Sequence, residues 1–126
     1  MQVTVLIVDD NEDTRKLYEF ALTHTGHSVT GVSNGADTIQ LLANYKPDLI
    51  IADIVMPEVS GIDLIKFVRK QHDLASIPII VISGYYRGYH EEARKAGATV
   101  VLDKPVDPVA LPTIVDRLLA SVSTAD

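Results

Sequence analysis

Acidic, hydroxyl and basic side chains follow four apolar segments of this chain, each where the segment ends. Asp9 and Asp10 follow the first segment, Asp53 closes the second, Ser83 follows the third and Lys104 stands just after the fourth. If these segments are parallel strands of one sheet, their carboxyl ends lie at one edge and the polar side chains meet there. Three carboxylates, a hydroxyl and an ammonium group would then share one site.

Carboxylates this close repel one another unless a cation lies among them. A hard divalent ion such as Mg²⁺ relieves that repulsion through oxygen ligands, and it commonly binds phosphate oxygens as well. Lys104 would supply a positive charge and Ser83 a hydroxyl donor to the same phosphoryl group. No glycine-rich phosphate loop is present, so the group would arrive on another molecule. An aspartate can attack it and form an aspartyl phosphate, so the set favours phosphoryl transfer to a carboxylate.

Each of these residues also has an ordinary structural interpretation. Asp9 and Asp10 could cap the following helix, Ser83 could bond its own backbone, and Lys104 could stand in a solvated turn. A lone aspartate after a strand is usually a turn or cap residue, so Asp53 by itself indicates nothing. Only the five residues taken together indicate a site.

Apolar periodicity predicts five strands that alternate with five helices. This alternation indicates an α/β fold, a doubly wound five-stranded parallel sheet with helices on both faces, for which 2-1-3-4-5 is a common strand order. The expected strands are residues 3–8, 28–32, 49–53, 79–82 and 99–102. The expected helices run from the capping residues 11–14 to about 25, from 36 to about 45, from 62 to 70, from 91 to 96, and from Pro108 or Leu111 onward.

In the 2-1-3-4-5 order the first and third strands are neighbours at the topological switch point, where ligands bind at the carboxyl ends of strands. Asp9 and Asp10 end the first of these strands and Asp53 ends the third. The rule therefore places the three carboxylates in the expected crevice without reference to any family.

Pro112 conflicts with a last helix that begins at Pro108. A proline inside a helix removes one backbone hydrogen bond and crowds the carbonyl group four residues earlier. The helix therefore either begins near Leu111 or has a distorted first turn.

The composition is that of a folded acidic protein with one domain, expected at residues 1–122 with a frayed tail at 123–126. The chain has 126 residues, 47% of them hydrophobic, and a formal net charge of −6, which argues against nonspecific binding to nucleic acid or anionic membranes. Cysteine is absent, which excludes disulfides and thiolate chemistry. No segment resembles a signal peptide or approaches the ~18 apolar residues of a membrane span, so a cytoplasmic protein is the default expectation.

The sequence resembles, over essentially its whole length, the receiver domain of bacterial two-component response regulators. The residues that carry the resemblance are Asp9-Asp10, Asp53 with Met56-Pro57 and Gly61, Ser83, Ala96-Gly97-Ala98 and Lys104-Pro105. The resemblance implies a flavodoxin-like, CheY-like fold with the strand order given above. It also suggests a cis peptide bond before Pro105.

This resemblance implies a role for each candidate residue. Asp53 would accept a phosphoryl group from a histidine kinase or a histidine phosphotransfer protein. Mg²⁺ would be bound by Asp10, Asp53 and the backbone carbonyl of Val55, with Asp9 acting largely through water. The phosphoryl oxygens would be contacted by two further side chains, Ser83 and Lys104.

The implied protein is a stand-alone response regulator, a phosphoacceptor that catalyses its own phosphorylation and dephosphorylation. Its downstream protein target is expected on the face formed by the fourth helix, fifth strand and fifth helix. Binding of nucleic acid or membrane is not expected. The alternatives are a degenerate receiver that binds partners without phosphorylation, a Mg²⁺-dependent phosphatase or phosphotransferase and, more distantly, a flavin-binding protein.

The sequence departs from the receiver pattern on the fifth strand. Val101 stands where receivers usually carry a tyrosine or phenylalanine, so the aromatic half of the usual switch is absent. Ser83-Gly84-Tyr85 resembles a subset of stand-alone receivers that also lack this aromatic. We therefore expect the loop at residues 84–89, with Tyr85 and Tyr86, to carry the switch.

Overall fold

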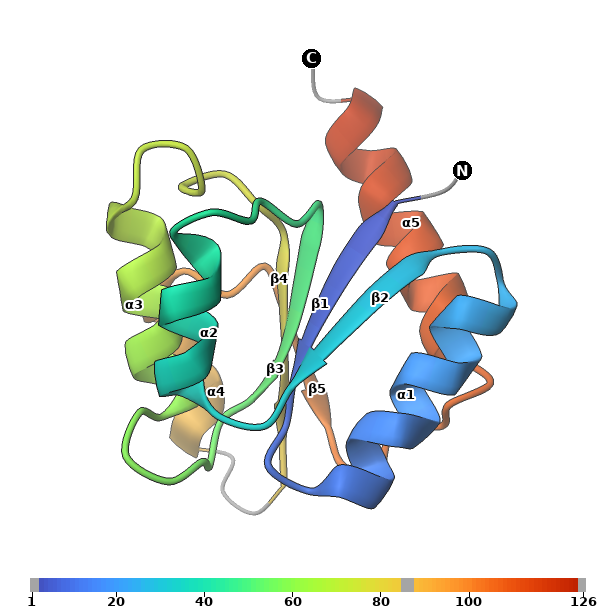
Figure 1. The fold of residues 1–126 in the computed structure, drawn as a ribbon, viewed down its shortest axis with the longest axis horizontal. Coiled ribbons are helices and arrows are strands. Elements are labelled where there is room, and N and C mark those ends of the chain that lie inside the picture. The colour runs from blue at the N-terminus through green and yellow to red at the C-terminus, as the bar shows by residue number, and fades with distance from the viewer. Residues whose placement is uncertain (1–2, 85–87, 125–126) are drawn as a thin grey trace.

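Five parallel strands form a sheet between two layers of helices in the computed structural model, which describes residues 3–84 and 88–124 (Figure 1). The strands are β1 (Thr4–Val8), β2 (Ser28–Val32), β3 (Leu49–Asp53), β4 (Ile79–Ser83) and β5 (Val100–Asp103). The helices are α1 (Glu12–His24), α2 (Gly35–Leu42), α3 (Gly61–Lys70), α4 (Gly88–Ala96) and α5 (Leu111–Thr124). The order β2-β1-β3-β4-β5 confirms the predicted α/β class and topology.

Side-chain alternation along the strands divides the core into two layers. On β1, Val5 and Ile7 pack in the cluster that contains the apolar side chains of α1 and α5, whereas Leu6 and Val8 pack in the cluster of α2, α3 and α4. Every residue of β3 and β4 is buried, because helices cover both faces of these central strands (Figure 1). The strand ends and the loops that follow them are therefore where polar groups can gather.

Side-chain caps begin three of the helices close to the carboxyl ends of the strands. Asn11, Asn34 and Ser60 each accept a hydrogen bond from the backbone N–H three residues further on. Each cap satisfies one of the N–H groups that have no partner inside the helix. The caps thereby fix the three loops that border the carboxyl edge of the sheet.

Two helices differ in length from the sequence prediction. α2 ends at Leu42 rather than near residue 45, because the N–H groups of Ala43 and Asn44 bond carbonyls three residues back and close a turn. α4 begins at Gly88, ahead of the predicted start at residue 91. The end of α2 carries no glycine or proline, and the apolar spacing in the sequence did not extend the fourth helix back to Gly88.

The last helix begins at Leu111, one of the two alternatives that Pro112 left open. Residues 108–110 form a turn in which the N–H of Ala110 donates to the carbonyl of Asp107. Pro112 then lies in the first turn of α5, where a missing N–H costs no helical hydrogen bond. The helix continues to Thr124, so residues 123 and 124, expected in the tail, are helical. The division into a domain at 1–122 and a tail stays a prediction.

No helix among the described residues has both the length and the apolar character that crossing a bilayer requires.

Arg69, near the end of α3, binds together loops at the edge of the sheet opposite to the strands' carboxyl ends. Its guanidinium donates to the carbonyls of Ala75 and Ile77 at 3.0 and 2.7 Å, and twice to that of Gly97 at 3.0 and 2.8 Å. Burial lowers the pKa of Arg69 from its ordinary value, but an arginine side chain stays charged in proteins. The forked donors of one side chain thus join three segments.

Replacing Arg69 by lysine should weaken this junction, because one ammonium group cannot reproduce the forked geometry. We expect Arg69→Lys to lower the free energy of unfolding by about 1–2 kcal/mol, as lost hydrogen bonds to partly buried carbonyls do. Urea unfolding measures the difference, with the exposed Arg94→Lys as the matched control. Equal unfolding midpoints for the two variants would contradict the assigned role.

Candidate functional site

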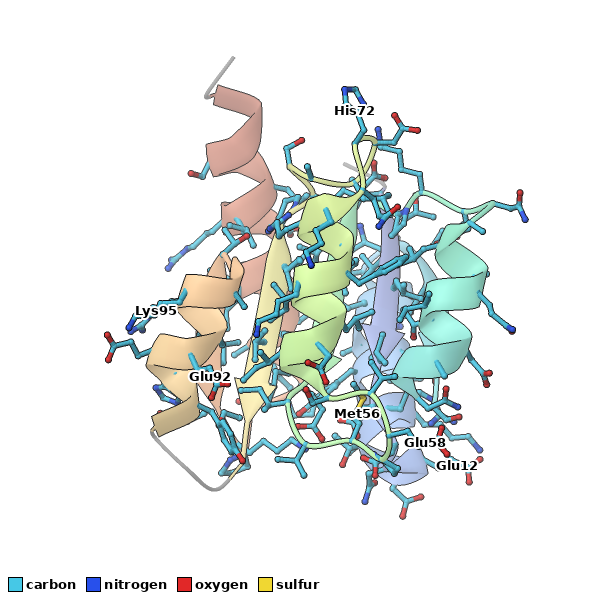
Figure 2. The ribbon with its side chains drawn as sticks, turned by 90° about the vertical axis from the view of Figure 1, so that its left-hand side faces the viewer. Glu12, Met56, Glu58, His72, Glu92 and Lys95 are labelled. Atoms are coloured by element: carbon cyan, nitrogen blue, oxygen red, sulfur yellow. The ribbon has the colours of Figure 1, made fainter. Side chains whose placement is uncertain are left out.

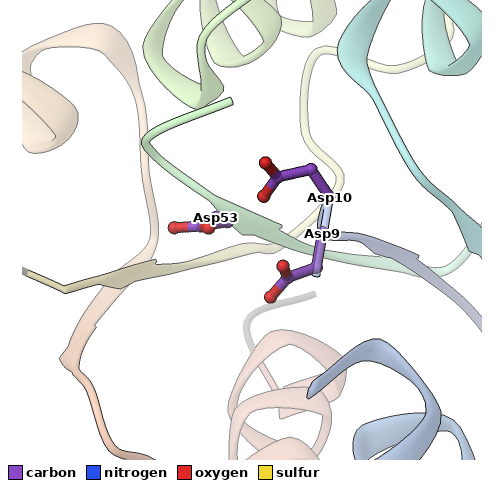
Figure 3. Close-up of side chains that lie close together, drawn as sticks. All are labelled: Asp9, Asp10 and Asp53. Atoms are coloured by element: carbon purple, nitrogen blue, oxygen red, sulfur yellow. The ribbon is translucent and has the colours of Figure 1, made fainter. Parts of the chain in front are cut away.

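The predicted acidic residues meet at the carboxyl edge of the sheet. Asp9 and Asp10 directly follow β1, Asp53 is the last residue of β3, and these two strands are neighbours. Each carboxylate offers one oxygen atom within 4.8 Å of the others, and Figure 3 shows the three side chains turned toward a common space. Asp9 and Asp53 are only 2% and 7% exposed, whereas Asp10 is open to solvent. A ligand can therefore enter from the side of Asp10.

Lys104 reaches the same cluster from the loop after β5. Its Nζ atom donates a hydrogen bond to Oδ2 of Asp53 at 3.1 Å and lies 3.8 Å from Oδ2 of Asp9. The backbone N–H of Lys104 donates to the carbonyl of Ser83 at 2.8 Å, which continues the pairing of β4 with β5. The peptide bond between Lys104 and Pro105 is cis, as the sequence resemblance suggested.

Ser83 and Val55 lie in the segments where the sequence placed them, at the end of β4 and in the loop after β3. Ser83 is the buried last residue of β4, the strand next to β3. Within the described residues no hydrogen bond joins its hydroxyl group to Asp53 or Lys104. Val55 stands two residues after Asp53 in the loop before α3, and its side chain is exposed. Their roles toward a metal or a phosphoryl group stay predictions.

Among the described residues, the carboxylates of the site outnumber the ammonium group that lies beside them. Burial raises the pKa of Asp9, and the negative charges of Asp53 and Asp10 raise it further. The hydrogen bond from the N–H of Asn11 and the positive charge of Lys104 lower this pKa but do not cancel the rise. Burial by itself would lower the pKa of Lys104, but its hydrogen bond to Asp53 and the nearby carboxylates outweigh burial and raise it. One ammonium group thus faces three carboxyl groups, and a further cation would stabilise them.

Gly61 allows the loop after Asp53 to fold closely against the site. Its N–H donates to the carbonyl of Ile54 at 2.8 Å. A Cβ atom at this position would clash with the carbonyl oxygen of Asp53 and would lie 2.8 Å from Cα of Ile54. Only glycine fits this close approach of backbone to backbone, which gives a physical reason for one of the residues that carried the resemblance.

Two residues that support the site were not singled out from the sequence. Arg15 donates from Nη1 to the carbonyl of Asp9 at 3.0 Å, and the N–H of Asn11 donates to Oδ1 of Asp9 at 2.9 Å. The first turn of α1 therefore orients Asp9 in addition to beginning the helix. Arg15 follows the cap Asn11 by one helical turn, and this spacing was the only signal available in the sequence.

A second contact that the sequence did not reveal joins α4 to the end of β5. Nε2 of His90 lies 2.7 Å from Oδ1 of Asp103, the residue before Lys104, in an approach that is close but lacks good hydrogen-bond alignment. Val101, at the position of the usual aromatic residue, packs half-buried against the core on the α4 side of the sheet. Tyr85 and Tyr86, expected to carry the switch, lie outside the described residues.

The raised pKa of Asp9 leads to a prediction about stability and pH. A folded protein that binds this proton more tightly than the unfolded chain loses stability as pH rises through the folded-state pKa. We expect Asp9→Asn to raise the free energy of unfolding at neutral pH by about 1 kcal/mol. The gain should vanish below about pH 3, where Asp9 is protonated in both states.

Urea unfolding at several pH values, without divalent metal, measures this difference. Asp73→Asn, at an exposed position on the opposite edge, serves as the control. A loss of stability in Asp9→Asn at neutral pH would contradict the assigned charge imbalance.

Comparison with known proteins agrees with this geometry. The family model described as "Response regulator receiver domain" matches residues 5–116. The polar-differentiation response regulator DivK of Brucella anthropi is 33% identical over 107 residues, which are 84% of this chain and 87% of that protein. An uncharacterized 14.6 kDa protein of Leptolyngbya boryana is 36% identical over 117 residues, covering 92% of this chain and 89% of that one.

Solved structures show the same likeness. The signal receiver domain of a signal transduction histidine kinase from Syntrophus aciditrophicus superimposes with a TM-score of 0.88 at 32% identity, covering 95% of this chain and 92% of that one. The chemotaxis response regulator CheY4 of Vibrio cholerae gives a TM-score of 0.87 at 28% identity, covering 94% and 99%. The fold, the acidic cluster with its lysine and these matches together place the chain in the family of response regulator receiver domains.

Proposed function

We propose that this receiver domain acts in a two-component phosphorelay through Asp53, which accepts a phosphoryl group from a phosphohistidine donor. The observation that carries the proposal is the position of the Asp53 carboxylate between Lys104, 3.1 Å away, and the carboxylates of Asp9 and Asp10. Of the three acids, Asp53 alone accepts a hydrogen bond from Lys104 among the described residues. An oxygen atom of this carboxylate would attack the incoming phosphorus atom.

The donor set fits Mg²⁺. Carboxylate oxygens are the ligands that this ion prefers, and the exposed Asp10 leaves room for the waters that it usually keeps. We assign Asp10, Asp53 and the carbonyl of Val55 as direct ligands, with Asp9 acting through water. When bound, the ion would offset negative charge on the phosphoryl oxygens. Because one lysine does not balance three carboxylates, a bound cation would also relieve the repulsion within the site.

The transfer can be written with residues of this chain. An Oδ atom of Asp53 forms a new P–O bond while the P–N bond to the donor histidine breaks. The leaving nitrogen keeps the electron pair and is protonated by solvent. Lys104 moves from the Asp53 carboxylate to a phosphoryl oxygen, and the hydroxyl of Ser83 donates to another. Water attack on phosphorus would later return Asp53 to its free form, so the protein catalyses both its own phosphorylation and its dephosphorylation.

The phosphohistidine donor must pack against the carboxyl edge of the sheet. Large apolar side chains are exposed on α1 and in the segment before α5, which lie in the same helical layer: Leu17 is 55% exposed, Phe20 71% and Val109 82% (Figure 1). We propose that this surface, which begins at the carboxyl edge and continues along α1, receives the histidine kinase or histidine phosphotransfer protein, because exposed apolar side chains favour protein contacts. The downstream target is assigned to the face of α4, β5 and α5. The protein would meet both partners in the cytoplasm.

Intact mass after incubation with acetyl phosphate and Mg²⁺ tests the proposal. We expect one added phosphoryl group on the native protein and none on Asp53→Asn. Asp10→Asn should reduce the yield, because it removes a metal ligand, and a chelator should abolish it. Asp73→Asn, far from the site, should be phosphorylated like the native protein.

Phosphorylation that persists in Asp53→Asn would contradict the assignment of the acceptor. If acetyl phosphate gives neither adduct nor released phosphate, purified phosphorylated histidine kinases replace it as donors. Failure with these donors as well would favour a degenerate receiver and overturn the proposal.

A further inference from the structure

A groove of about 250 Å³ lies between the first turns of α3 and the helix α4, which run side by side (Figure 2). Its floor is made by the buried side chains of Ile54, Met56 and Ile62, and Val55, 53% exposed, adds an apolar wall. The volume is below the ~300–1,000 Å³ typical of pockets for small molecules. It suits one or two side chains of a protein rather than a cofactor.

The rim of the groove carries two carboxylates that have no ion-pair partner in the described part of the chain. Asp63 on α3 and Glu92 on α4 both line it and are exposed. Neither carboxylate has an ion-pair partner within residues 3–84 and 88–124, whereas Glu91, next to Glu92, pairs with Lys95 at 3.5 Å. Lys66, one turn after Asp63, also lines the groove, so two carboxylates face one ammonium group. The rim therefore has room for one further positive charge.

We propose that this groove docks an arginine side chain of a partner protein, together with a neighbouring apolar residue that packs on Val55. An arginine has a long apolar stem that can cover the floor and a charged head that stays at the rim. Its planar guanidinium can donate to both Asp63 and Glu92, which a compact ammonium group does less well. Because Lys66 repels a second cation, the groove selects a segment with a single arginine.

The groove and the acidic site share one loop. Val55 and Met56 follow Asp53 by two and three residues. The N–H of Gly61 donates to the carbonyl of Ile54, the residue between Asp53 and Val55. A partner in the groove therefore touches the segment that leaves the phosphoacceptor. The docking itself needs no phosphoryl group, so it goes beyond the proposed function and can be tested on the unmodified protein.

The probe is the peptide acetyl-Ala-Leu-Arg-Ala-amide, titrated into the ¹⁵N-labelled protein and followed by backbone amide chemical shifts. We expect saturable shifts of the amides of Val55, Ile62, Asp63 and Glu92. The control peptide has citrulline in place of arginine, which keeps the shape of the side chain but removes its positive charge. It should bind about fivefold more weakly, because a partly exposed ion pair contributes about that much to affinity.

Asp63→Asn and Glu92→Gln should each weaken binding of the arginine peptide by about the same factor. Glu91→Gln, one residue away on α4, is the matched control and should leave the affinity unchanged. Each variant's dispersed amide spectrum shows that it is folded.

Three results would overturn the proposal. The first is the absence of saturable shifts, or shifts centred on Asp9 and Asp10 instead of the groove. The second is equal binding of the arginine and citrulline peptides. The third is a shift of the groove amides when the protein alone is concentrated, which would make a second copy of this chain the occupant.

Discussion

The contact between Lys104 and Asp53 partly balances the negative charge that the topology of the sheet concentrates at one edge. Parallel pairing of β1 with β3 brings Asp9, Asp10 and Asp53 together, and two of these carboxylates are almost fully buried. Burying charged groups so close is unfavourable without a counter-charge. Lys104 provides one positive charge at 3.1 Å, and the remaining excess of carboxylate would be stabilised by a further cation.

The rest of the fold holds these groups in place. The central strands are buried on both faces, so the positions of Asp53 and Ser83 are fixed by the two apolar cores on either side of the sheet. Gly61 lets the loop after Asp53 return closely to the strand, and Arg15 binds the backbone of Asp9. At the opposite edge Arg69 joins its own helix to two loops by donating to the carbonyls of Ala75, Ile77 and Gly97.

The sequence predicted what depends on regular patterns. Alternating apolar segments predicted the fold class, for which 2-1-3-4-5 is a common strand order. In that order the switch-point rule placed the three acids in one crevice without reference to any family, and the resemblance then implied the order itself. The sequence could not predict contacts that depend on how separate elements pack. Two examples are the hydrogen bond from Arg15 to the carbonyl of Asp9 and the close approach of His90 to Asp103. Pro112 allowed two possible first residues for α5, Pro108 or Leu111. The turn before the helix, which no sequence pattern indicated, makes Leu111 the first residue.

The most direct test of the central claim locates the phosphoryl group chemically. Borohydride reduces an aspartyl phosphate to homoserine, whereas free carboxylates do not react. After phosphorylation with Mg²⁺ present, peptide mass mapping should find homoserine at position 53 and aspartate at positions 9 and 10. Homoserine at either of those positions, or at none of the three in a protein that carries the added phosphoryl group, would contradict the account.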